Sequence, residues 1–186
     1  MTDDVPPPEL DVPDEWRRVS AEVTTPFEMR LVTVTAHTHV YEDVALRDRL
    51  AEATGTEATW RFVFASRLHV RPRPPSSTAL TRLVADRAAG RFVETLDDRG
   101  FSEVARAGTR RIDLGGGDRD RREVRATRYR AQVSVGDRDL PVEAYFAAWR
   151  AGDGHLLGGG AYPLSLPLPL PPRDQVCDPD ECDPDE

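Results

Sequence analysis

The chain has 186 residues, with 33 acidic and 25 basic side chains and a formal net charge of -8, and every one of the 25 is arginine. A chain of this length can bury the core of one domain without disulfide or metal staples. The first ten residues lack the basic and apolar regions of a secretory signal, and no run approaches the 18 apolar residues of a membrane span. We therefore expect a cytoplasmic domain without membrane contact.

The charge is unevenly distributed along the chain. Residues 1–15 and residues 173–186 each carry -6, whereas residues 16–172 carry +4. A surface that binds water and cations through Asp and Glu, and that avoids lysine, suits a cytoplasm held at multimolar salt. The composition therefore predicts a halophilic, haloarchaeal protein with a mildly basic body between acidic tails.

The N-terminal third predicts a disordered segment followed by a strand, a helix and a second strand. Residues 1–15 combine four prolines with six carboxylates, which favours disorder, and Trp16 is the first large anchor. Alternating apolar and polar residues over 29–41 and 60–70 predict strands that each have one wet face. A short helix fits residues 43–54, which Gly55 closes.

The longest helix is expected between the N-cap hydroxyls at 76–78 and Gly100. Four strands follow at 104–114, 123–135, 140–150 and 155–164, and short charged turns between them predict antiparallel pairing. Gly158 to Gly160 lie inside the last strand, where missing side chains permit a β-bulge or the close approach of another backbone or ligand, and of these we expect the bulge.

These elements predict an α+β domain over residues 16–163. Its antiparallel sheet has about six strands, two helices pack on one face, and the element order is βαβαββββ. The prolines of residues 164–172 predict an extended Leu/Pro-rich arm. Residues 173–186, in which CDPDE occurs twice, predict a disordered acidic tail.

Three sequence segments carry a resemblance to a known group of proteins. They are WRRVSAEVTTPFEMRLVTVTAHTHVYED from Trp16, WRFVFASRLHV from Trp60, and VEAYFAAWRAGDGHLLGGGAYP from Val142. Over Trp16–Pro163 the chain resembles uncharacterised haloarchaeal proteins of similar length. The element order also resembles the PsbP-like α+β sandwich, which implies a non-catalytic docking or assembly subunit. The resemblance implies no functional residue.

Three histidines form the first candidate site. His37 and His39 share one face of a strand, and His69 is predicted on the wet face of the next strand. Such a trio suits catalytic zinc, which takes three protein ligands and a water. The alternative is an ordinary solvated strand face. Cys177 and Cys182 add thiol ligands, but they lie in the acidic tail without the second pair that a structural zinc site needs.

Arginines form the second candidate site, because guanidinium groups bind carboxylates and phosphates bidentately. Four of them are predicted on wet strand faces: Arg61, Arg67, Arg128 and Arg130. The alternative is a solvated sheet face on which these arginines pair with carboxylates such as Glu143. The nucleic-acid candidate is the run Arg119, Arg121, Arg122, Arg125, Arg128 and Arg130, but acidic residues interrupt it and Tyr129 is its one aromatic residue.

The sequence therefore favours a non-catalytic binding or docking domain over an enzyme. We expect a protein partner or a small ligand to bind its exposed sheet face or its Leu/Pro arm. Two alternatives remain: a zinc-dependent activity at His37, His39 and His69, and an anion or nucleic-acid site on the arginine-rich strand face.

Overall fold

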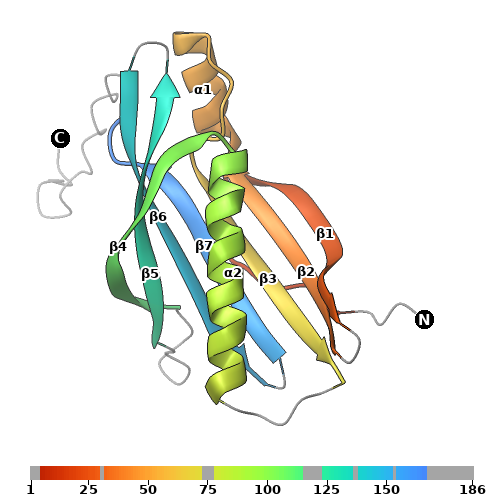
Figure 1. Cartoon of the computed structure of the whole chain (residues 1–186). Helices are drawn as coiled ribbons and strands as arrows, with labels where there is room; N and C mark the ends of the chain where they lie inside the picture. Colours follow the sequence, from red (N-terminus) through yellow and green to blue (C-terminus); the bar gives the residue numbers. More distant parts are fainter. Residues whose placement is uncertain are drawn as a thin grey trace, which may run out of the picture.

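The computed structural model describes residues 5–29, 32–72, 78–114, 123–135, 138–152 and 154–166. These residues form an α+β domain with one antiparallel sheet, whose strand order is β1-β2-β3-β7-β6-β5-β4, and with two helices (Figure 1). In chain order the elements are β1 (Trp16–Met29), β2 (Val32–Asp43), α1 (Val44–Thr54), β3 (Phe62–Arg71), α2 (Thr78–Asp98), β4 (Phe101–Asp113), β5 (Glu123–Val135), β6 (Arg138–Ala151) and β7 (Gly154–Pro163). No helix in this described part is both long and apolar enough to cross a membrane.

The predicted strand count and order were wrong at the N-terminus, because β1 precedes β2 and makes the order ββαβαββββ. The sequence of β1 lacks a clean alternation, and its Val19 and Val23 are exposed. An edge strand tolerates this pattern because one of its sides has no neighbour in the sheet. Pro26 fits there for the same reason, and the register with β2 shifts just beside it.

Helix α2 crosses one face of the sheet and builds the main core with it (Figure 1). The Phe92 ring of α2 lies 5.5 Å from the Phe146 ring of β6 and 5.7 Å from the Phe64 ring of β3, measured between ring centroids. Leu96, one turn further on, is fully buried. This face therefore carries the larger of the two apolar clusters formed by the described residues.

Helix α1 follows β2 directly and forms as predicted. The side chain of Asp43 caps its first turn by accepting a hydrogen bond from the Leu46 amide at 3.0 Å. Gly55 ends it in the left-handed conformation that favours glycine. Leu46 and Leu50 point from α1 into the same core that α2 covers.

Strand β7 lies between β3 and β6 and carries three successive glycines, which form no bulge. A Cβ atom on Gly160 would lie 2.3 Å from the Phe62 carbonyl oxygen, and one on Gly159 would lie 2.6 Å from the Tyr145 carbonyl oxygen. The glycines therefore allow close approach of the neighbouring strands. The expected bulge was wrong. Glycine inside a strand can mark either a bulge or the close approach of a neighbouring backbone, and β7 shows the close approach without any shift of register.

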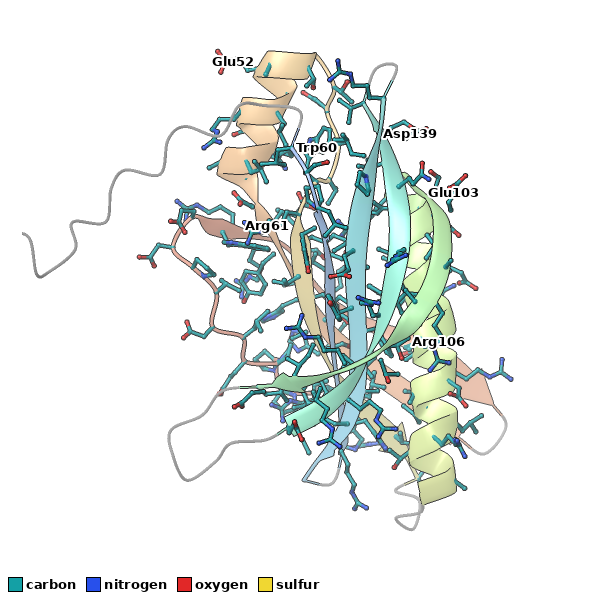
Figure 2. The ribbon with its side chains drawn as sticks, turned by 90° about the vertical axis from the view of Figure 1, so that its left-hand side faces the viewer. Glu52, Trp60, Arg61, Glu103, Arg106 and Asp139 are labelled. Carbon is teal, nitrogen blue, oxygen red and sulfur yellow. The ribbon has the colours of Figure 1, made fainter. Side chains whose placement is uncertain are left out.

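The second face of the sheet, turned away from α2, is here called the far face. Residues 5–15, which we predicted as part of a disordered segment, form no helix or strand and cross this face on the side opposite α2 (Figure 2). The side chain of Val5 is 1% exposed. At the other end, the Leu164 amide donates to the Pro141 carbonyl at 2.8 Å, and Leu166 packs against the main core. The rest of the predicted arm and tail lies outside the described residues.

Candidate binding site

The far face carries two groups of polar side chains, which meet where β3 pairs with β7. The first, which we call the histidine half, consists of side chains from β2 and β3: Thr33, Thr35, His37, His39, Arg67 and His69. The second, which we call the tyrosine half, consists of side chains from β4 to β7: Arg110, Arg128, Arg130, Glu143, Tyr145, Trp149 and Tyr162. Alternation along each strand places these residues on the same side of the sheet.

Glu143 is the centre of the tyrosine half. The hydroxyls of Tyr145 and Tyr162 both donate to its Oε2 at 2.8 Å, and Arg128 donates to its Oε1 at 3.3 Å. A second nitrogen of Arg128 donates to the Ala107 carbonyl at 3.2 Å. Both carboxylate oxygens therefore have partners, and the side chains around them are fixed by one connected network.

The network sets the charge of this centre. Burial raises the pKa of the Glu143 carboxyl, but the hydrogen bonds from Tyr162 and Tyr145 and the positive charge of Arg128 outweigh burial and hold the pKa below its usual value. Burial and the Glu143 carboxylate raise the pKa of Tyr162. Glu143 is thus an anion at neutral pH, and Tyr162 is a neutral hydrogen-bond donor.

The surroundings of Glu143 combine aromatic rings with arginine. The Tyr145 and Tyr162 rings are stacked with centroids 6.4 Å apart, and Trp149 packs with Tyr145 over a small apolar cluster of β5 and β6. Arg110 is exposed and donates to the Tyr145 hydroxyl at 3.5 Å. Arg130 is also exposed and forms no ion pair with another described residue. The tyrosine half therefore presents three arginines around one carboxylate.

The histidine half is built by direct pairing of β2 and β3. His37 lies opposite Arg67, and Thr35 lies opposite His69. The His37 Nδ1 atom lies 2.8 Å from the Val5 carbonyl oxygen, so Nδ1 carries the proton and donates it. This bond joins the N-terminal segment to the far face.

His39 is the most buried residue of the histidine half. Its Nδ1 atom is buried and has no hydrogen-bond partner, and its ring meets that of His37 edge to face with centroids 5.0 Å apart. Burial, followed by the charges of Arg18 and His37, lowers the pKa of His39. Its imidazole is therefore neutral at physiological pH.

The three predicted metal ligands share the far face, but they form no metal site. Among the described residues, no three His, Cys, Asp or Glu side chains are arranged to hold a metal ion. His69 lies diagonally across from His37, the His37 Nδ1 atom is bonded to the Val5 carbonyl, and the His37 and His39 rings meet edge to face. Cys177 and Cys182 lie outside the described residues.

The four predicted anion-binding arginines are not gathered in one site. Arg61 precedes β3, pairs with Asp43 at 3.4 Å and stacks on the Trp16 ring at 5.1 Å. Arg67 belongs to the histidine half, whereas Arg128 and Arg130 lie two strands beyond β7. Pairing of Arg128 with Glu143 confirms the alternative of a cross-strand ion pair.

The predicted nucleic-acid run does not form one surface over its described part. Arg125 faces the α2 side of β5, and Arg128 and Arg130 face the far side. Arg119, Arg121 and Arg122 lie outside the described residues. Sequence reasoning missed the two tyrosines, although the Glu-x-Tyr spacing of Glu143 and Tyr145 already places both on one strand face.

A family model for a domain of unknown function, DUF6517, matches residues 3–185. The chain belongs to the DUF6517 family. No curated protein and no solved structure matches it. The match covers the sheet, both helices and the acidic segments at each end, so the family unit includes both halves of the far face.

Proposed function

We propose that this chain is a non-catalytic binding domain that docks an acidic segment of a protein partner onto the tyrosine half. The observation that supports this most directly is the fixed network in which two tyrosines and Arg128 hold Glu143 on a face that α2 does not cover. Side chains that are already held in place lose less conformational entropy on binding, which raises affinity. The network therefore prepares a surface for a partner.

The residue types of the tyrosine half also support a protein partner. Tyr, Trp and Arg contribute most of the energy in protein interfaces because they combine large contact areas with hydrogen bonds. Tyr145, Trp149 and Tyr162 are all half-buried, so each offers part of its ring to a partner while the strand holds the rest.

The charge of the tyrosine half favours an acidic partner segment. Arg110 and Arg130 flank the Arg128–Glu143 pair, which leaves an excess of positive charge. Complementary charges select the partner and guide its approach. The central carboxylate would repel a closely spaced phosphate backbone. A protein segment, whose carboxylates can avoid Glu143, therefore fits better than a nucleic acid.

The test is recovery of bound proteins from cells of the source organism, followed by cross-linking. The bait proteins are the wild type, an Arg110→Glu/Arg130→Glu variant, and an Arg82→Glu/Arg87→Glu variant whose changes lie on exposed positions of α2. We expect one partner to be retained by the wild type and by the α2 variant and to be lost by the first variant. Its cross-linked peptide should be acidic and should attach near β4 and β5.

Two results would contradict the proposal. The first is retention of the same proteins by all three baits, because binding that persists after Arg110 and Arg130 are both replaced by Glu does not depend on the charge of the tyrosine half. The second is loss of binding after nuclease treatment, which would assign the face to nucleic acid.

We also propose that the protein works in the salt-rich cytoplasm of a haloarchaeon. The PsbP-like resemblance rested on the predicted order βαβαββββ, which lacks β1, and adds no support to the docking role. The excess of Asp and Glu and the complete use of arginine support the habitat. Unfolding midpoints should rise from dilute to multimolar KCl. A midpoint that falls or stays constant would contradict the assigned habitat.

A further inference from the structure

A compact block of polar side chains lies in the histidine half. Arg67 of β3 is flanked across the strand pair by His37, and the next residue on the same face of β3, His69, lies opposite Thr35. Directly paired side chains on one sheet face lie about 5 Å apart at Cβ, and diagonal neighbours lie about 7 to 8 Å apart. One ligand group can therefore reach all four side chains.

The charge of Arg67 is not compensated within the described structure. Its Nε atom is buried without a hydrogen-bond partner, and Arg67 forms no ion pair with another described residue. An arginine stays protonated in proteins, and a partly buried charge without a partner is unfavourable. By contrast, Arg128, the half-buried arginine of the tyrosine half, has both Glu143 and the Ala107 carbonyl.

The described part of the N-terminal segment, residues 5–15, does not supply the missing partner. It crosses the far face and bonds to His37 through the Val5 carbonyl. Its four described carboxylates nevertheless remain exposed: Glu9, Asp11, Asp14 and Glu15. Residues 5–15 thus approach the block with a backbone oxygen, and none of their carboxylates pairs with Arg67.

The side of Arg67 away from β2 is apolar. Leu156 of β7 lies opposite Arg67, and Trp149 of β6 lies opposite Leu156. The Trp149 ring also covers Gly158, where a Cβ atom would meet the ring at 3.2 Å. A nearby apolar wall lowers the local dielectric constant and so strengthens the attraction between a bound anion and Arg67.

We infer that this block binds the phosphate group of a small ligand, at a site centred on Arg67 that shares Trp149 with the tyrosine half but does not depend on the proposed docking. Arg67 supplies a planar fork of N–H donors, and His69 and Thr35 add further donors. Several donors that approach from different directions suit the three oxygens of a phosphate group better than the two oxygens of a carboxylate. The organic part of the ligand lies toward Leu156 and Trp149.

The test is titration of the full chain with inorganic phosphate, glycerol phosphate and acetate, followed by calorimetry and by NMR of the wild type. We expect both phosphates to bind, with chemical-shift changes centred on Arg67, His37 and His69, and acetate to bind more weakly. Tighter binding of glycerol phosphate would assign the site to a phosphorylated small molecule, and equal binding would assign it to free phosphate.

Two variants separate a local effect from a general effect of charge. Arg67→Gln should weaken phosphate binding about tenfold or more, because a charge-assisted contact is lost. Arg87→Gln removes the same charge from an exposed position of α2 and should leave binding unchanged. The wild-type shift map keeps the test decisive if Arg67→Gln fails to fold.

Three outcomes would overturn the inference. They are an absence of phosphate binding to the wild type, equal affinities of the wild type and Arg67→Gln, and acetate binding as tight as that of phosphate. None of them bears on the docking proposal, whose variants lie on β4 and β5.

Discussion

The two halves of the far face share one sheet but satisfy their arginines in different ways. In the tyrosine half, Arg128 bonds to Glu143 and to a backbone carbonyl, so its charge is matched inside the molecule. In the histidine half, Arg67 has a buried Nε without a partner. This difference in pairing is why we propose docking at the tyrosine half and binding of an external anion at Arg67.

The halves also differ in what covers them. Residues 5–15 cross the far face and bond to His37 of the histidine half (Figure 2). The tyrosine half is instead held by hydrogen bonds between its own strands. Strand β7 joins the two, and its glycines allow both neighbouring strands to come close. We call the β7 glycines the joint, residues 5–15 the cover, and the hydrogen bonds around Glu143 the network. Substitutions in these three places should affect different parts of the far face.

The largest effect is expected at the joint, from Gly160→Ala. The added Cβ would lie 2.3 Å from the Phe62 carbonyl oxygen, so β7 must move away from β3. Overpacking of this kind should lower the free energy of unfolding by about 3 kcal/mol. Urea denaturation measures the change, and NMR shifts should change in both halves.

Gly90→Ala is the matched control for the joint. Gly90 lies on an exposed position of α2, and nothing lies within 4 Å of an added Cβ. Alanine favours the helix, so this variant should gain about 0.5 to 1 kcal/mol. A Gly160→Ala protein as stable as the wild type would show that the two halves are not held together at β7.

The second effect is expected in the cover, from Val5→Ala. The Val5 side chain is 1% exposed, so loss of its two methyl groups should cost about 1.5 kcal/mol in unfolding free energy. NMR shifts should change in the histidine half and stay constant around Glu143. Leu10→Ala, at a residue 36% exposed, should change stability by less than about 0.5 kcal/mol. Equal effects of the two variants would contradict docking of Val5.

The sequence predicted most elements because their periodicity is clear. Both helices and the six strands from β2 onward lie close to their predicted positions, and Gly55 ends α1 as expected. The sequence could not predict β1, because an edge strand with exposed valines lacks alternation. It also gave no indication that β7 inserts between β3 and β6, since that placement depends on contacts between strands far apart in the chain.

The sequence predicted which face of the sheet the candidate site residues occupy, but not which of them lie next to one another. Alternation correctly placed His37, His39, Arg67 and Arg128 on one sheet face. Strand order then separated Arg67 from Arg128 by β7 and β6, which divided the predicted anion site in two. The buried Nδ1 of His39 and the unmatched Nε of Arg67 depend on side-chain packing, for which the sequence contains no local signal.

The third effect is expected in the network, from Glu143→Gln. The neutral amide loses the ion pair with Arg128, which is partly exposed, so the cost should be about 1 kcal/mol at pH 7. Because the folded pKa of Glu143 is lowered, its contribution is fully present above the unfolded value of about 4.3 and is lost as pH falls through the folded pKa. Denaturation curves of the wild type and the variant should therefore converge in acid. A difference that persists at the lowest pH would show that the network acts through shape rather than charge.

The smallest effect is expected from His39→Gln, in the histidine half. It should be recognisable by the pH range over which the stability of the variant differs from that of the wild type. Burial, Arg18 and His37 lower the folded pKa of His39, so the unfolded chain takes up a proton at this residue first. Stability is therefore lost as pH falls from the unfolded value of about 6.5 towards the folded pKa. Glutamine does not titrate, so the variant should lose less stability over this range. His155, whose pKa burial and Arg150 also lower, titrates in both proteins and cancels in the difference. If the curves of stability against pH for the wild type and His39→Gln run parallel between neutral pH and pH 5, His39 is not a buried neutral imidazole. A difference between the two curves that is confined to this range would distinguish the histidine half from the network of Glu143, whose effect appears at lower pH.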